Sequence, residues 1–182
     1  MNDMFLYYYF EKVIPAEICD NIIQKYDNKL SISTIMNDSE NIVDSSTRNV
    51  LSTDIDAWER SFIHYYGYLA NNINYKYDVT ELSQCNFLKY CSKMFYKPHL
   101  DTSFNLNHPS FYRKLSVVLQ LNDDYEGGDF ILYGDTMFDE IILPKTKGTI
   151  IVFPSNRYHE VKEITSGNRY SIIGWLSGNH FR

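Results

Sequence analysis

Cysteine and histidine are scarce in this sequence: 182 residues contain 3 Cys and 5 His. The odd number of cysteines, at Cys19, Cys85 and Cys91 with no close spacing, argues against both a disulfide framework and a zinc knuckle. A reducing compartment suits such a chain, so we expect a cytoplasmic protein, or one of the host cytoplasm if a phage encodes it. Any ordered histidine pattern must draw on five residues.

Basic residues and long apolar runs are also few. The 17 Lys and Arg are outnumbered by 23 Asp and Glu, and the net charge is −6. Because nucleic-acid binding rests on neutralising phosphates, we expect no nucleic-acid partner. No apolar run reaches the roughly 18 residues of a membrane span, and the N-terminus lacks the basic start of a signal peptide. We therefore expect no membrane partner.

The chain is instead rich in aromatic residues, with 16 Tyr and 11 Phe in an ordinary globular composition. Ile18, Ile22 and Tyr26 follow Pro15 at helical spacing. A second helix is predicted within residues 54–73, after an Asp54 cap. Its apolar stripe consists of Trp58, Phe62, Tyr65, Leu69 and Ile73. Residues 31–53 are polar and are predicted to be irregular.

From about residue 82 the hydrophobic period changes to two. Short β-branched and aromatic runs, such as KLSVVLQLN, GTIIVFP and RYSIIGWLSG, alternate with Gly-containing turns. The pattern predicts an α+β, mainly β protein with a sandwich or barrel-like double sheet. We expect one domain over residues 1–182, with helical support over about 1–80 and the β core over about 81–182. The polar segment 102–112 is predicted to be a mobile loop near a site.

Two metal-ligating side chains stand close together in His99-Leu100-Asp101. On a strand, residues i and i+2 point to the same face, so an imidazole and a carboxylate there can bind one metal. His159, just after the run GTIIVFP, supplies a third ligand. Two His and one carboxylate form the ligand set of non-haem Fe(II) oxygenases. Zinc accepts the same ligands, and a surface pair of His99 with Asp101 is the alternative that involves no metal.

Arg169 opens the run RYSIIGW, ten residues after His159. If residues 160–168 form a turn, strand pairing brings Arg169 back beside the metal-bearing sheet. Its planar guanidinium matches the two oxygens of a carboxylate, such as the distal one of a metal-chelating 2-oxo acid. The alternative is a surface ion pair with Glu160 or Glu163.

Four ordered blocks over about residues 82–178 resemble the Fe(II)/2-oxoglutarate dioxygenases of the prolyl 4-hydroxylase type. YCSKMFYKPHLD is similar to that family's Tyr-x-x-Gly-x-x-Tyr-x-x-His-x-Asp signature. HEVKEITSGNRYSIIGW resembles its His-x-Val … Thr-Ser-Gly-x-Arg-Tyr … Gly-Trp signature, LNDDYEGGDF its Gly-Gly turn, and GTIIVFPS its strand before the distal His. VIPAEICDNII resembles its first helix.

The resemblance implies a double-stranded β-helix, or jelly roll, with supporting N-terminal helices. By position, His99, Asp101 and His159 would ligate Fe(II), and Arg169 would bind the C5 carboxylate of 2-oxoglutarate. Tyr90 and Gln120 would lie at the co-substrate. The residues implied at the substrate are Trp175, Tyr96, Arg113 and Arg48. Alternatives without a functional role are a core aromatic for Tyr96 and surface charges for the two arginines.

The implied activity is prolyl 4-hydroxylation of a protein or peptide that contains proline, with O₂ as second co-substrate and ascorbate as reductant. The products would be hydroxyproline, succinate and CO₂. Lys93 and Gln120 depart from the family pattern, which usually has Gly and often Tyr there. Hydroxylation of another side chain or a small metabolite, a non-catalytic jelly-roll binding module and a hydrolytic metal site remain alternatives.

Overall fold

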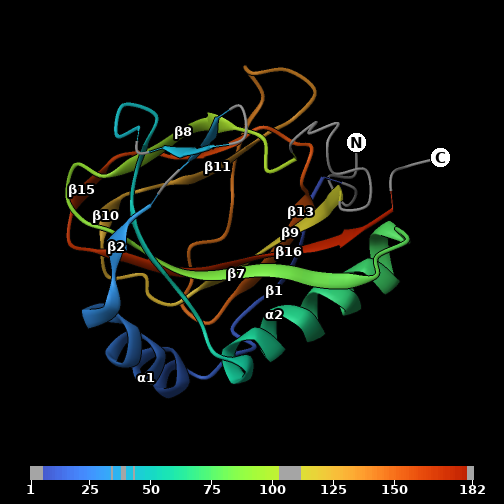
Figure 1. The fold of residues 1–182 in the computed structure, drawn as a ribbon, viewed down its shortest axis with the longest axis horizontal. Coiled ribbons are helices and arrows are strands. Elements are labelled where there is room, and N and C mark those ends of the chain that lie inside the picture. Colours follow the sequence, from blue (N-terminus) through green and yellow to red (C-terminus); the bar gives the residue numbers. More distant parts are fainter. Residues whose placement is uncertain (1–5, 34, 38–39, 43, 103–111, 180–182) are drawn as a thin grey trace.

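The computed structural model describes residues 6–33, 35–37, 40–42, 44–102 and 112–179 (Figure 1). Within these residues two α-helices, α1 (Ala16–Tyr26) and α2 (Ala57–Ala70), lie side by side beneath the larger of two facing sheets. Short 3-10 and π turns, Asp27–Lys29 and Asn71–Tyr75, extend them. None of the described helices is long and apolar enough to cross a lipid bilayer.

The described strands form two large antiparallel sheets and two small two-stranded sheets. The larger sheet has the order β1 (Tyr8–Phe10), β13 (Ile150–Pro154), β9 (Tyr112–Gln120), β16 (Arg169–Gly178), β7 (Glu81–Tyr90), β6 (Leu51–Asp54), β2 (Ser31–Ile32). The smaller has the order β12 (Glu140–Ile142), β11 (Phe130–Tyr133), β14 (His159–Val161), β8 (Phe95–His99), β5 (Arg48–Asn49). The two small two-stranded sheets are β10 (Glu126–Gly127) with β15 (Ile164–Ser166), and β3 (Ile35–Asn37) with β4 (Glu40–Ile42).

The larger sheet is buried on both faces. One face packs against the helices in a core that includes Ile22, Ile63 and Val117. The other face packs against the smaller sheet in a second core that includes Val118 and Phe153. Successive residues of a strand point to opposite faces, so the neighbours Val117 and Val118 belong to different cores. The prediction of a mainly β protein with helices covering one sheet is confirmed.

Helix α1 is as predicted, but α2 presents a different face to the sheet. Trp58, Tyr65 and Ile73, members of the predicted apolar stripe, are 53%, 61% and 51% exposed, whereas Ile63 and Gly67 are buried. A Cβ at Gly67 would come within 2.9 Å of Val117, so small residues let the helix approach the sheet closely. The cap was also misplaced, because the helix begins at Ala57 after Asp56 and Asp54 ends β6.

The first third of the chain is less helical than predicted. Strand β1 pairs with β13, β6 pairs with β7, and β5 pairs with β8, so this part completes both sheets. The segment 31–53, predicted to be irregular, contains several of these short strands. They lie near sheet edges and are too short to show a period of two. Residues 103–111, in the predicted loop, lie outside the described residues.

The orientation of α2 can be tested by comparing two alanine variants. Ile63→Ala is expected to lower the free energy of unfolding by roughly 2–5 kcal/mol, because it leaves a cavity in the core. Trp58→Ala is expected to lower it by less than about 1.5 kcal/mol, the loss of one exposed aromatic pair with Phe62. Urea unfolding followed by circular dichroism measures both, and a larger loss for Trp58→Ala would contradict the observed orientation.

Candidate metal centre

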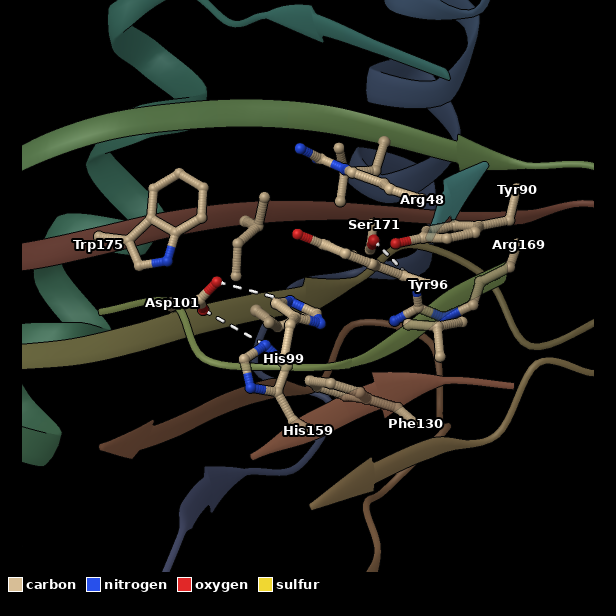
Figure 2. Close-up of a pocket in the computed structure, with 14 residues that line it drawn as sticks. Arg48, Tyr90, Tyr96, His99, Asp101, Phe130, His159, Arg169, Ser171 and Trp175 are labelled. Atoms are coloured by element: carbon tan, nitrogen blue, oxygen red, sulfur yellow. Dashed lines mark hydrogen bonds and ion pairs between the residues drawn. The ribbon is translucent and has the colours of Figure 1, made fainter. Parts of the chain in front are cut away.

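The smaller sheet brings the two predicted histidine ligands together. His159 on β14 is in register with His99, the last residue of the neighbouring strand β8. Asp101 lies two residues beyond that strand, and its carboxylate oxygens are 3.7 Å from Nε2 of His99 and 3.4 Å from Nε2 of His159 (Figure 2). One ligand atom from each of the three residues lies within 4.8 Å of the others. The predicted proximity of the three residues is therefore confirmed, and their role as ligands stays a proposal.

Backbone carbonyl oxygens hold both imidazoles so that Nε2 is the nitrogen left to bind a metal. Nδ1 of His99 is 2.8 Å from the carbonyl oxygen of Lys97, and Nδ1 of His159 is 3.0 Å from that of Arg157. A carbonyl oxygen can only accept, so Nδ1 carries a proton in each ring, and Nε2 faces Asp101. Burial, reinforced by the charge of His159, lowers the pKa of His99 to about 3. His99 is therefore neutral at ordinary pH, as a metal ligand must be.

Asp101 is the negative member of this cluster. Burial alone would raise the pKa of its carboxyl, but the charges of His159 and His99 and a hydrogen bond from Ser116 outweigh burial and lower it. The carboxylate is thus ionised beside the two imidazoles. This donor set fits Fe(II), which accepts mixed nitrogen and oxygen ligands and keeps positions open for other molecules.

A pocket with about 420 Å³ of empty space, including its opening to solvent, lies between the two sheets and contains all three residues. Arg169 and Tyr90 stand on one side of the cluster and Trp175 on the other (Figure 2). Tyr90 pairs in register with Arg169, and its ring centroid is 5.3 Å from the guanidinium carbon. Phe130, which sequence reasoning missed, also lines the pocket, near both His159 and Arg169.

Arg169 is a buried cation with neutral partners. It is 2% exposed, and its Nη atoms donate to Ser171 Oγ at 3.2 Å and Gln120 Oε1 at 3.0 Å. Among the described residues no carboxylate lies within ion-pair distance of it, and its buried Nε has no hydrogen-bond partner. Glu160 instead accepts a hydrogen bond from Tyr133 and forms an ion pair with Lys162. A buried guanidinium without a counter-charge fits an anionic ligand, such as the distal carboxylate of 2-oxoglutarate.

The route that brings Arg169 to the pocket differs from the predicted one. Strand β14, with His159, belongs to the smaller sheet, whereas β16, which begins at Arg169, belongs to the larger. Between them the chain forms β15, which pairs with β10. Arg169 therefore reaches the pocket across the gap between the sheets rather than by pairing beside β14.

Gln120 and Ser171 hold Arg169 from two sides. Gln120 lies behind Arg169 rather than in the pocket wall, and its Nε2 donates to the carbonyl oxygen of Pro144 at 3.4 Å. Ser171, which sequence reasoning missed, lines the pocket. The two-residue spacing between Arg169 and Ser171 could have predicted this position, because residues i and i+2 of a strand share a face.

The four residues predicted at the substrate form two cation–aromatic pairs. The guanidinium carbon of Arg48 is 4.9 Å from the ring centroid of Tyr96, which stacks on His99 with centroids 3.5 Å apart. That of Arg113 is 3.8 Å from the ring of Trp175. Arg48, Tyr96 and Trp175 line the pocket; Arg113 stands outside its wall and donates to the Asp101 carbonyl oxygen at 3.4 Å.

Lys93, where the family usually has Gly, keeps a backbone conformation that favours glycine. Lys93 has φ of 68°, the left-handed region where the family signature usually has Gly. Its amide donates to the carbonyl oxygen of Ile164 at 2.8 Å, which keeps the turn in place. A side chain there costs on the order of 1 kcal/mol relative to glycine, so the departure affects stability rather than the ligand set.

The fold and the donor set together are those of the non-haem iron oxygenases. Residues 85–177, about half of the chain, match the family model of the 2OG-Fe(II) oxygenase superfamily, and the chain belongs to that superfamily. As the name of the superfamily states, its members require Fe(II) and 2-oxoglutarate, and they use these together with O₂. The donor set at His99, Asp101 and His159 suits this iron, and the buried cation Arg169 suits this co-substrate.

Curated relatives include PKHD-type hydroxylases. One from Prochlorococcus marinus (strain MIT 9515) is 33% identical over 92 residues, which are 50% of this chain and 39% of that protein. Another, from Acinetobacter baumannii (strain ATCC 17978), is 34% identical over 83 residues, 43% of this chain and 36% of that protein. The chain thus spans less than half the length of these relatives.

Solved structures share the fold over nearly the whole chain. A prolyl-4-hydroxylase from Pseudomonas putida has a TM-score of 0.75 at 20% identity, covering 98% of this chain and 96% of that one. A prolyl hydroxylase from Trichoplax adhaerens, in complex with a hypoxia inducible factor peptide fragment, has a TM-score of 0.72 at 19% identity, covering 94% and 83%. The predicted double-stranded β-helix is therefore confirmed.

Proposed function

We propose that this protein is an Fe(II)- and 2-oxoglutarate-dependent prolyl 4-hydroxylase that acts on a protein or peptide. The observation that carries the proposal is the placement of a two-histidine, one-carboxylate cluster and a buried, uncompensated Arg169 in one pocket. The relatives and the structural neighbours, which are named as hydroxylases of this type, support it.

In this proposal His99, Asp101 and His159 hold the iron, which when bound couples the oxidative decarboxylation of 2-oxoglutarate by O₂ to hydroxylation of the substrate. The two imidazoles present Nε2 because backbone carbonyls hold the protons on Nδ1. Asp101 contributes the negative charge that offsets the metal. The buried walls of the pocket exclude water from the reacting groups.

Arg169 would bind the distal carboxylate of 2-oxoglutarate and so fix the length and direction of the co-substrate. Gln120 and Ser171 hold two of its nitrogens, and its Nε remains available. In this arrangement Gln120 acts on the co-substrate through Arg169, while Tyr90 contributes to the wall beside the guanidinium.

The proposed substrate groups are the two cation–aromatic pairs, Arg48 with Tyr96 and Arg113 with Trp175. Tyr96 and Trp175 line the pocket and would contact a pyrrolidine ring, and their partners Arg48 and Arg113 would donate to the carbonyl oxygens of a peptide. A peptide substrate also accords with the neighbour from Trichoplax adhaerens, which holds a peptide fragment. Its sequence preference depends on contacts along the rest of the peptide.

The substrate assignment can be tested with a peptide library that places proline in varied contexts. With Fe(II), 2-oxoglutarate, ascorbate and O₂, we expect succinate release and a mass gain of one oxygen atom on proline-containing peptides. Matched peptides with alanine in place of proline are the control and should stay unmodified. Succinate release with modification only at other residues would overturn the proline assignment. Absence of both succinate and metal binding would favour a non-catalytic binding module.

A further inference from the structure

We propose that Ser116, supported by Ser155, is a positioning residue that fixes the orientation of the Asp101 carboxylate for metal binding. The Ser116 hydroxyl donates to Oδ2 of Asp101 at 2.6 Å, the short distance of a charge-assisted bond. Ser116 lies on β9 of the larger sheet, whereas the two histidines lie on the smaller sheet. This inference rests on the proposed function, because it concerns the same metal site.

The direction of the two hydrogen bonds follows from counting protons. Ser116 Oγ and Ser155 Oγ are 2.9 Å apart, and both side chains are fully buried. A serine hydroxyl carries one proton, and the ionised carboxylate of Asp101 can only accept. Ser116 therefore donates its proton to Asp101 and accepts the proton of Ser155. The result is a chain of two hydroxyls that ends on the carboxylate.

Ser155 also holds the backbone that carries the carboxylate. Its carbonyl oxygen accepts hydrogen bonds from the amides of Asp101 at 3.0 Å and Thr102 at 3.2 Å. The segment after β8 is thus attached to the residue that follows β13, while the side chain of Asp101 is attached to β9. Main chain and side chain are both tied to the larger sheet, which places the carboxylate opposite the imidazoles.

This arrangement affects what Asp101 can offer a metal. Ser116 occupies one lone pair of Oδ2 and so sets the rotation of the carboxylate plane. The other oxygen, Oδ1, faces His99 at 3.7 Å from its Nε2. A carboxylate that binds through one oxygen leaves more coordination positions open to a co-substrate than one that binds through two. Ser116 thus favours an open metal site.

The test measures Mn(II) affinity of the full chain by electron paramagnetic resonance, so that it does not depend on turnover. Ser116→Ala is expected to weaken Mn(II) binding by about 10–100-fold, the usual effect of removing a partner of a metal ligand. Ser116→Thr, which keeps a hydroxyl, should restore affinity. Ser155→Ala should weaken binding in the same direction but less. The visible spectrum of bound Co(II), which reports coordination geometry, should change in Ser116→Ala.

Ser177→Ala is the matched control. Ser177 is a buried serine on β16 whose hydroxyl donates to Ser83 Oγ at 3.0 Å, outside the pocket wall. It should leave both Mn(II) affinity and the Co(II) spectrum unchanged. Equal affinity in wild type, Ser116→Ala and Ser177→Ala would overturn the inference alone. A wild-type protein that binds no Mn(II) would overturn the proposed function and this inference with it. If Ser116→Ala does not fold, Ser155→Ala decides, and its unchanged affinity would overturn the inference.

Discussion

Replacement of His159 by alanine is expected to weaken Fe(II) or Mn(II) binding by more than about 100-fold, because even an outer partner of a ligand contributes 10–100-fold. The variant removes one of the three proposed donors and leaves His99 and Asp101 with two. Succinate release that depends on 2-oxoglutarate should fall below detection. Calorimetric titration of the protein with Mn(II) under the same buffer conditions measures the affinity directly.

His64→Ala is the appropriate control for this experiment. His64 is an exposed residue of α2, on the far side of the larger sheet, and its ring contacts Tyr68 at 4.5 Å between centroids. Its replacement should change neither metal affinity nor turnover. Wild-type metal affinity in His159→Ala would show that the cluster is not the metal site, and the proposed function would then lose its main support.

Replacement of Arg169 by glutamine is expected to raise the KM for 2-oxoglutarate by roughly 100- to 1,000-fold, as two charge-assisted hydrogen bonds are lost. The metal ligands are untouched, so Mn(II) affinity should stay close to that of wild type. Turnover at saturating 2-oxoglutarate should fall much less than turnover at low concentration. Steady-state kinetics with varied 2-oxoglutarate separate these two effects.

A co-substrate analogue sharpens the Arg169 experiment. The wild-type protein should bind 2-oxoglutarate far more tightly than 2-oxobutyrate, which lacks the distal carboxylate. Arg169→Gln should lose most of this preference, because it has no charge to offer. Arg60→Gln, which alters an arginine bonded to the carbonyl oxygens of Leu82 and Ser83, should retain it. An unchanged preference in Arg169→Gln would place the carboxylate site elsewhere.

The parts of the site that sequence reasoning predicted are those encoded by local spacing. His99 and Asp101 are two residues apart, and an end-of-strand position suffices to turn both toward His159. The strands β9, β13 and β16 were visible because central strands of a sheet covered on both faces are almost continuously apolar. The resemblance to a known family then supplied the pairing of Arg169 with 2-oxoglutarate, which spacing alone left open.

The parts that were missed depend on packing between distant elements. Aromatic residues lie on several faces of α2, so the stripe with Trp58, Tyr65 and Ile73 did not identify the face that packs on the sheet. The face with Gly67 packs there, because glycine lets the helix approach the strands closely. Ser116 is a single serine within the apolar strand β9, and its position alone indicates no role. The proposed role of Ser116 depends on its hydrogen bond to Asp101, 15 residues away along the chain, which the sequence does not show.

The two histidines of the cluster and Arg169 stand on different sheets, and the ring of Phe130 lies near both. Phe130 has its centroid 6.0 Å from that of His159 and 5.6 Å from the guanidinium carbon of Arg169. Protein cores are close-packed, so this spacing is as fixed as the thickness of the sandwich itself. In the proposed function, this spacing would select among dicarboxylates by the distance between their two ends. Mutations deep in the core, remote from any polar contact, would then alter co-substrate choice.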